Sequence, residues 1–145
     1  MSTEKNSPYC GCLYFAANAL GRLLTGLADQ EFRTTGLAPS LAFVVMNVNR
    51  QPGIQPSQLS EVMKLTPSTV SRLVEKLEHQ GYLRREVTGR TTQVHATEKG
   101  QALQPQLQAA WRNLYARYSE LIGVDAARQL TQNSYTAIQA LEEAE

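Results

Sequence analysis

Apolar and polar positions divide the chain into helical stripes separated by short turn signals. Between about Tyr9 and Thr34, apolar residues recur every three or four positions, which predicts an amphipathic helix. The stripe consists of Leu13, Ala16, Ala17, Leu20, Leu24, Leu27 and Ala28. Gly36 and Pro39 then break the pattern. We expect the polar residues before the helix, up to Pro8, to form a disordered tail.

A nearly continuous apolar run extends from Ser40 to Asn49. Its valines are compatible with a strand, whereas Pro39 and Ser40 at its head favour a buried helix. The turn signal Gln51-Pro52-Gly53 ends the run. A second short helix is predicted from Pro56, because proline fits the first turn of a helix. Its apolar face consists of Leu59, Val62 and Met63.

The next helix follows the tight turn Lys64-Leu65-Thr66. Thr66 is a predicted N-cap and Pro67 the first helical residue. Gly81 ends the helix where a left-handed conformation is needed. The apolar stripe on one face consists of Val70, Leu73, Val74 and Leu77.

In the next segment, apolar and polar residues alternate instead of recurring at helical spacing. Residues 82–87 read as a strand, Thr88-Gly89 as a turn and residues 92–96 as the returning strand. Two short helices followed directly by a β-hairpin are typical of a winged helix-turn-helix. The predicted fold class is therefore mainly α with a small β-hairpin wing.

The C-terminal part reads as helix. Thr97-Glu98 is predicted to cap a long helix, Gly123 interrupts it, and residues 124–144 form the last helix. The apolar face of the long helix contains Leu103, Leu107, Ala110, Trp111, Leu114, Tyr118 and Leu121. In the last helix, the predicted inward residues are Ala127, Leu130, Ile138 and Leu141.

The polar face of the helix after Pro67 indicates how such a protein binds DNA. Short hydroxyl side chains near a helix N-terminus can approach base edges in the major groove, and an arginine can reach guanine or a phosphate. The predicted DNA-binding residues on this helix are Ser68, Thr69, Ser71, Arg72 and Lys76. The alternative is that these side chains are simply solvated surface.

The hairpin adds further basic residues. Arg90 at its tip fits the minor groove, where the potential is most negative, although it could also be an ordinary exposed arginine. Arg84 and Arg85 point to opposite faces of the strand, so one is expected to touch a phosphate and the other to pair with an acid. Residues 62–99 hold seven Lys or Arg and four acids, a net charge of +3 within a chain of net charge +1.

Composition narrows the function classes. No apolar run approaches the roughly 20 residues that span a bilayer, and no signal-peptide core precedes Pro8, so we expect a soluble, cytoplasmic protein. The sequence contains no phosphate loop, nucleophile elbow or zinc-protease motif, so we expect neither an enzyme nor a cofactor. The alternatives are a thiol peroxidase that uses Cys10, and a winged-helix adaptor that binds protein instead of DNA.

Residues 59–85, together with Gly89-Arg90 and A-T-E-K-G at 96–100, resemble the DNA-binding core of the MarR family. The resemblance implies that Ser68, Thr69, Ser71 and Arg72 read the major groove and that Arg90 is the wing arginine. It further implies a transcription regulator, usually a repressor, that a small molecule or thiol oxidation releases from DNA. The wing departs from the family, which usually has an Asp at the position of Thr88 and a longer loop.

The resemblance also implies a single domain over residues 1–145 that forms a homodimer. Residues 9–36 and 101–145 are the expected helical dimerisation region, and residues 40–100 the DNA-binding region. The apolar stripes of the terminal helices exceed what a small head can cover, which independently favours pairing. Two-fold pairing predicts a pseudo-palindromic operator with half-sites ~34–36 Å apart.

The role of Cys10 and Cys12, and with it the signal that releases the protein from DNA, is not decided by the sequence. Cys10 and Tyr14 resemble the start of the first helix in the family's organic-hydroperoxide sensors, which makes Cys10, Cys12 and Tyr14 a candidate redox site. Two further tyrosines of those sensors are absent, because Leu24 and Ala38 occupy their positions. The thiols could instead be inert.

Metal binding is the least favoured reading of the thiols, because His79 and His95, the only histidines, lie in the DNA-binding region. We therefore expect no metal site. The other effector is a small aromatic ligand, for which Tyr14, Phe15, Phe43 and Trp111 could form a pocket.

Overall fold

The computed structural model describes residues 6–145 and contains two compact units. One comprises residues 31–112, and the other combines residues up to 30 with residues 113–145. The first five residues of the predicted tail lie outside the described part of the chain. Within that part, no helix combines the length and apolarity needed to cross a membrane.

The unit of residues 31–112 is built around a buried helix, α2, at Pro39–Arg50. Pro39 stands at its start, and side chains on nearly all its sides are buried, as the continuous apolar run requires. The run is therefore a helix rather than a strand. The core around α2 is completed by Phe32, Ile54, Leu59, Val70, Val74, Leu77, Leu83, Val94 and Leu107.

Helices α3 (Pro56–Met63) and α4 (Pro67–His79) form the predicted helix pair. The turn between them uses Lys64 in a left-handed conformation, with φ of 57°. The Thr66 hydroxyl accepts a hydrogen bond from the backbone N–H of Thr69 at 3.3 Å, so Thr66 caps α4 as expected. Gly81, with φ of 82°, ends the helix.

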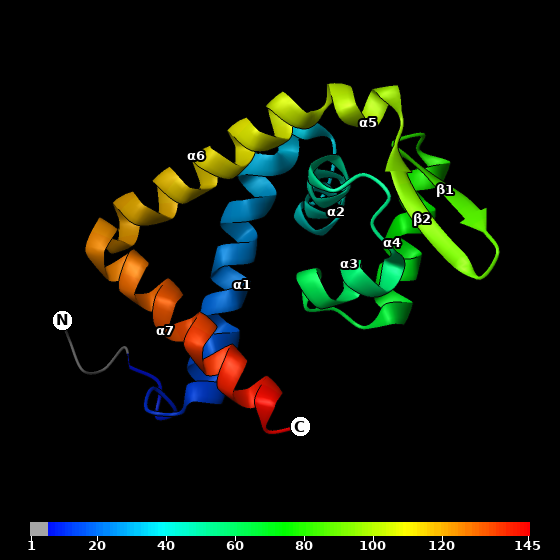
Figure 1. Ribbon diagram of the computed structural model, residues 1–145. Coiled ribbons are helices and arrows are strands. Elements are labelled where there is room, and N and C mark those ends of the chain that lie inside the picture. The colour runs from blue at the N-terminus through cyan, green and yellow to red at the C-terminus, as the bar shows by residue number, and fades with distance from the viewer. Residues whose placement is uncertain (1–5) are drawn as a thin grey trace. The chain divides into compact units, whose positions relative to one another are not determined.

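A two-stranded antiparallel hairpin follows, with β1 at Leu83–Thr88 and β2 at Thr91–Ala96. Gly89 has a φ of 62°, whereas the φ of Arg90 is not positive. This combination is that of a type II′ turn. The register pairs Leu83 with Ala96 and Thr88 with Thr91. The tip of the hairpin extends beyond the helices of this unit (Figure 1).

The predicted long helix after Thr97 is interrupted. It forms a short α5 (Glu98–Ala102) and then α6 (Gln104–Ile122), with Leu103 between them. Pro105 explains the break, because it has no backbone N–H to donate and its ring crowds the preceding turn. Gly100 lies so close to the start of β1 that an added Cβ would stand 2.3 Å from the carbonyl oxygen of Tyr82.

The other unit contains α1 (Leu13–Phe32) as far as Gln30, the second half of α6 and α7 (Val124–Glu143). Helix α1 begins four residues later than predicted, and a 3₁₀ turn, η2 (Arg33–Thr35), follows it. Of the described residues of this unit, only Ser119 and Ala127 are buried. Its large exposed apolar side chains include Leu13, Leu23, Leu121, Val124, Tyr135 and Leu141. The apolar stripes read from the sequence therefore remain largely uncovered in one copy of the chain.

Candidate nucleic-acid interface

The exposed tip of α4 carries a connected group of hydroxyl side chains. The Thr66 hydroxyl lies 2.9 Å from that of Thr69 and 3.3 Å from that of Ser68. Ser68 is exposed, whereas Thr69 is half-buried. Val70, Val74 and Leu77 pack into the core on the opposite face. The buried stripe thus fixes the rotation of the helix and presents its hydroxyl face to solvent.

Arg72 belongs to the same surface. Its Nη2 donates a long hydrogen bond of 3.5 Å to the Thr69 hydroxyl, and its side chain is otherwise exposed. Ser71 and Lys76 are also exposed, with Lys76 one turn further along the helix. Such a surface can offer short donors to base edges and two cations to bases or phosphates. The structure therefore brings together the five residues predicted on α4.

The hairpin places the remaining predicted residues on its two faces. Arg90 stands at the exposed tip, beside Gly89. Arg85 forms an ion pair with Glu78 of α4, with 2.6 Å between Nε and Oε1. Arg84 lies on the other face, where its Nη1 is 3.6 Å from the carboxylate of its neighbour Glu86. Arg85 is thus the arginine with a close acidic partner.

The predicted redox residues lie outside this surface. Cys10 and Cys12 are exposed and precede α1 instead of lying within it. The backbone carbonyl of Cys12 accepts from the N–H of Ala16 at 2.9 Å, so Cys12 stands at the helix start. The side chain of Tyr14 is 80% exposed. Cys10 therefore lies before α1, whereas the resemblance had placed it at the start of the first helix.

The aromatic residues considered for a ligand pocket belong to different units. Phe43 and Trp111 meet edge to face, with ring centroids 6.0 Å apart, in the unit of residues 31–112. They line a cavity of about 560 Å³ with Met46, Asn47, Arg50, Val62, Met63, Gln104 and Gln108. Tyr14 and Phe15 belong to the other unit. The sequence analysis placed Met63 on an apolar helix face but assigned neither the methionines nor Arg50 to a pocket, where they supply an apolar wall and one cation.

A separate apolar cavity of about 320 Å³ lies within the other unit. Side chains from α1, α6 and α7 line it, among them Leu20, Leu24, Tyr118 and Ile138. Burial raises the pKa of the Tyr118 phenol, and the neighbouring Tyr115 raises it further. The three helices thus share an apolar surface that a single copy of the chain leaves partly open.

Comparison with known proteins agrees with this geometry. The model of the MarR family matches residues 35–91, which contain α2, α3, α4, β1 and the wing tip. An HTH-type transcriptional regulator of Bacillus subtilis, YybA, is 28% identical over 91 residues, which make up 61% of this chain and 61% of that protein. The chain thus matches less than two thirds of this relative.

Solved structures share the fold over nearly the whole chain. CouR from Rhodococcus jostii, bound to p-coumaroyl-CoA, has a TM-score of 0.76 and 23% identity, covering 91% of this chain and 95% of CouR. The regulator MosR of Mycobacterium tuberculosis, in complex with DNA, has a TM-score of 0.78 and 20% identity, covering 92% and 98%. At this identity the likeness establishes the fold, which is the predicted winged helix with additional helices.

Proposed function

We propose that this chain is a member of the MarR family, as the resemblance of residues 54–100 predicts and the family-model match over residues 35–91 supports, and that it is a dimeric DNA-binding transcription regulator. The observation that carries the proposal is the exposed hydroxyl and arginine surface at the start of α4, opposite its buried stripe. MosR, which was crystallised with DNA, has the same fold. We place the protein in the cytoplasm and assign it no catalytic role.

In the proposed complex, α4 enters the major groove. Ser68, Thr69, Ser71 and Arg72 contact base edges, and Lys76 neutralises a phosphate. Arg90 enters the adjacent minor groove, and Arg84 contacts the phosphate backbone of the DNA. The exposed apolar faces of the terminal helices, over residues 9–36 and 101–145, pair two copies, so that both α4 helices meet one pseudo-palindromic operator.

We further propose that the protein is a repressor whose DNA affinity a small aromatic acid lowers. The cavity beside Phe43 and Trp111 supports this effector class, because it combines apolar walls with Arg50. CouR, a structure of the same fold, binds p-coumaroyl-CoA, which contains an aromatic group. Thiol oxidation at Cys10 and Cys12 is the second candidate signal, favoured by the exposure of both thiols.

The deciding experiment is selection of bound duplexes from a random DNA pool. A palindromic consensus, with affinity that falls steeply as salt is added, is expected, because phosphate neutralisation releases counterions. Absence of salt-dependent duplex binding would favour the protein-interaction adaptor.

A second selection after mild peroxide treatment, with Cys10→Ser/Cys12→Ser as control, distinguishes thiol oxidation from a small aromatic acid as the effector. Binding that survives oxidation of the parent protein removes the redox signal and retains the regulator.

A further inference from the structure

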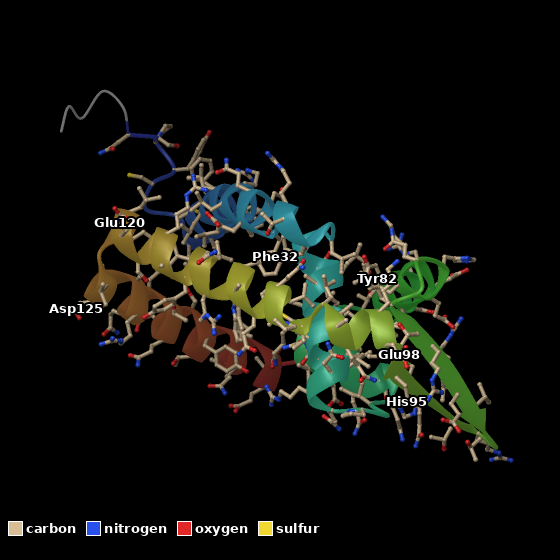
Figure 2. The ribbon with its side chains drawn as sticks, turned by 90° about the horizontal axis from the view of Figure 1, so that it is seen from above. Phe32, Tyr82, His95, Glu98, Glu120 and Asp125 are labelled. Carbon is tan, nitrogen blue, oxygen red and sulfur yellow. The ribbon has the colours of Figure 1, made fainter. Side chains whose placement is uncertain are left out.

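A segment of three residues, Gln80-Gly81-Tyr82, joins the end of α4 to the start of the wing, and we call it the junction. Its three backbone N–H groups all donate to carbonyl oxygens in the last turn of α4, at 2.9–3.1 Å. The left-handed Gly81 makes this return possible. Figure 2 labels Tyr82 of the junction and Glu98 in the first turn of α5. The N–H side of the junction is thus satisfied by α4.

The carbonyl side of the junction is satisfied from the start of α5. The Gln80 carbonyl oxygen accepts from Nζ of Lys99 at 2.7 Å. The Gly81 carbonyl oxygen accepts from the Thr97 hydroxyl at 2.6 Å. The Tyr82 carbonyl oxygen accepts from the backbone N–H of Thr97 at 3.0 Å. Two residues beyond the hairpin therefore supply donors to all three carbonyl groups that connect α4 with the wing.

Each of these two residues has a second contact that holds it in place. The Thr97 hydroxyl also accepts from the backbone N–H of Gly100 at 3.2 Å, so the same oxygen caps α5. The Lys99 ammonium lies 4.3 Å from the centroid of the Tyr82 ring, which is a cation–π distance. Both side chains are therefore directed to the junction by more than one interaction.

We propose that Thr97 and Lys99 are positioning residues for DNA binding, which hold the junction so that α4 and the wing contact one duplex together. The inference rests on the proposed function, in which Arg90 enters the minor groove beside α4. Two elements that are already held together lose less conformational freedom on binding than two loosely joined ones. The effect of Thr97 and Lys99 on affinity is therefore expected to act through Arg90.

Other contacts also join the hairpin to this unit, so the expected effect is partial. Leu83 is buried in the core, and Arg85 forms its ion pair with Glu78 of α4. Removing one junction contact leaves these in place. We therefore expect a wing that remains folded and becomes less well held at its base.

Two substitutions with matched controls remove the junction contacts. Thr97→Val retains the shape of the side chain without its hydroxyl, and Thr97→Ser retains the hydroxyl. Lys99→Met retains a long unbranched side chain without the ammonium, and Lys99→Arg retains a cationic donor. Lys99 is exposed and methionine favours helix, so Lys99→Met leaves the fold intact even if Thr97→Val, which also removes the α5 cap, does not.

Amide hydrogen exchange of the full-length protein without DNA tests the junction itself. The N–H of Tyr82, which donates to the Leu77 carbonyl, reports on the junction, and the N–H of Val45 in the buried α2 is the reference. Lys99→Met is expected to speed exchange at Tyr82 by about five-fold, the effect of one ordinary hydrogen bond, with no change at Val45. Equal acceleration at both amides, or none at Tyr82, would overturn the positioning role.

Fluorescence anisotropy on the selected operator tests the link to DNA. Lys99→Met is expected to weaken binding by about three- to five-fold, and Lys99→Arg to restore it. If Lys99 acts through Arg90, the loss caused by Arg90→Ala is smaller by the same factor in the Lys99→Met background than in the parent. The loss caused by Arg72→Ala is expected to be equal in the two backgrounds.

Additive losses from Lys99→Met and Arg90→Ala would overturn the inference. A salt dependence that Lys99→Met lowers even in the Arg90→Ala background would also overturn it, because Lys99 would then contact a phosphate directly. A parent protein that binds no duplex refutes the proposed function and this inference with it. A parent that binds its operator while the losses are additive refutes this inference alone.

Discussion

Arg85 of β1 and Glu78 of α4 form an ion pair with 2.6 Å between Nε and Oε1, which links the wing to the helix proposed to read DNA. Glu78 stands near the end of α4, and Arg85 lies on the face of the hairpin turned toward that helix. The side chains are 40% and 26% exposed for Arg85 and Glu78, so solvent screens the pair only in part. The contact joins β1 to the end of α4 in addition to the buried side chains Leu77, Leu83 and Val94.

Removing this ion pair is expected to lower stability modestly. Because the pair is partly exposed, Glu78→Gln and Arg85→Gln are each expected to lower the free energy of unfolding by about 1 kcal/mol or less. The double variant is expected to lose little more than either single variant. Urea unfolding of the four proteins measures the coupling, and additive losses would show that the two side chains do not interact.

Arg72 and Arg90 are expected to contribute to DNA binding in different ways. Arg72→Ala is predicted to cost about 1–3 kcal/mol on the selected operator and to relax base preference, because we propose that its guanidinium contacts a base. Arg90→Ala is predicted to weaken binding to all sequences by a similar factor. Fluorescence anisotropy on the operator and on a scrambled duplex measures both effects. Equal losses of base preference in the two variants would contradict these roles.

The Thr66 hydroxyl caps α4 and also contacts the hydroxyls of Ser68 and Thr69. Thr66→Ala is expected to lower the free energy of unfolding by about 1 kcal/mol, since a backbone N–H at the helix start loses its acceptor. Thr66→Ser retains the hydroxyl and is the matched control, with a much smaller loss. Thermal unfolding provides the measurement, and identical melting of the alanine and serine variants would exclude the capping role.

Gly100 is required where α5 passes the start of β1. A Cβ at this position would stand 2.3 Å from the Tyr82 carbonyl oxygen, a backbone atom that cannot move without displacing β1. Gly100→Ala is therefore expected to cost about 1–3 kcal/mol, as overpacking does. Gly21→Ala is the control, because that helical position is open and alanine favours helix. If both variants unfold at the same denaturant concentration, the proposed clash is absent.

Local patterns were sufficient to predict most elements of this protein. Thr66 and Pro67 mark the start of α4, and Gly81 its end, because capping, proline geometry and a left-handed glycine each act within a few residues. The five residues predicted on α4 occur together on the side away from its buried stripe for the same reason, since helical spacing determines which side chains share a face. The wing was likewise predictable from alternation and turn residues, although its two-residue turn is Gly89-Arg90 instead of the predicted Thr88-Gly89.

Only the tertiary structure could decide which polar groups meet across elements. Whether Arg84 or Arg85 pairs with an acid depends on which face of β1 packs against α4, and Asn49 acquires its partners on Gly100 and Gln104 from more than 50 residues away. The start of α1 after Cys12 also differs from the helical periodicity, whereas the break at Leu103 follows from Pro105, a local signal that apolar spacing alone does not register. Periodicity describes the neighbours of a residue along the chain, whereas these features arise from contacts and backbone geometry that apolar spacing does not encode.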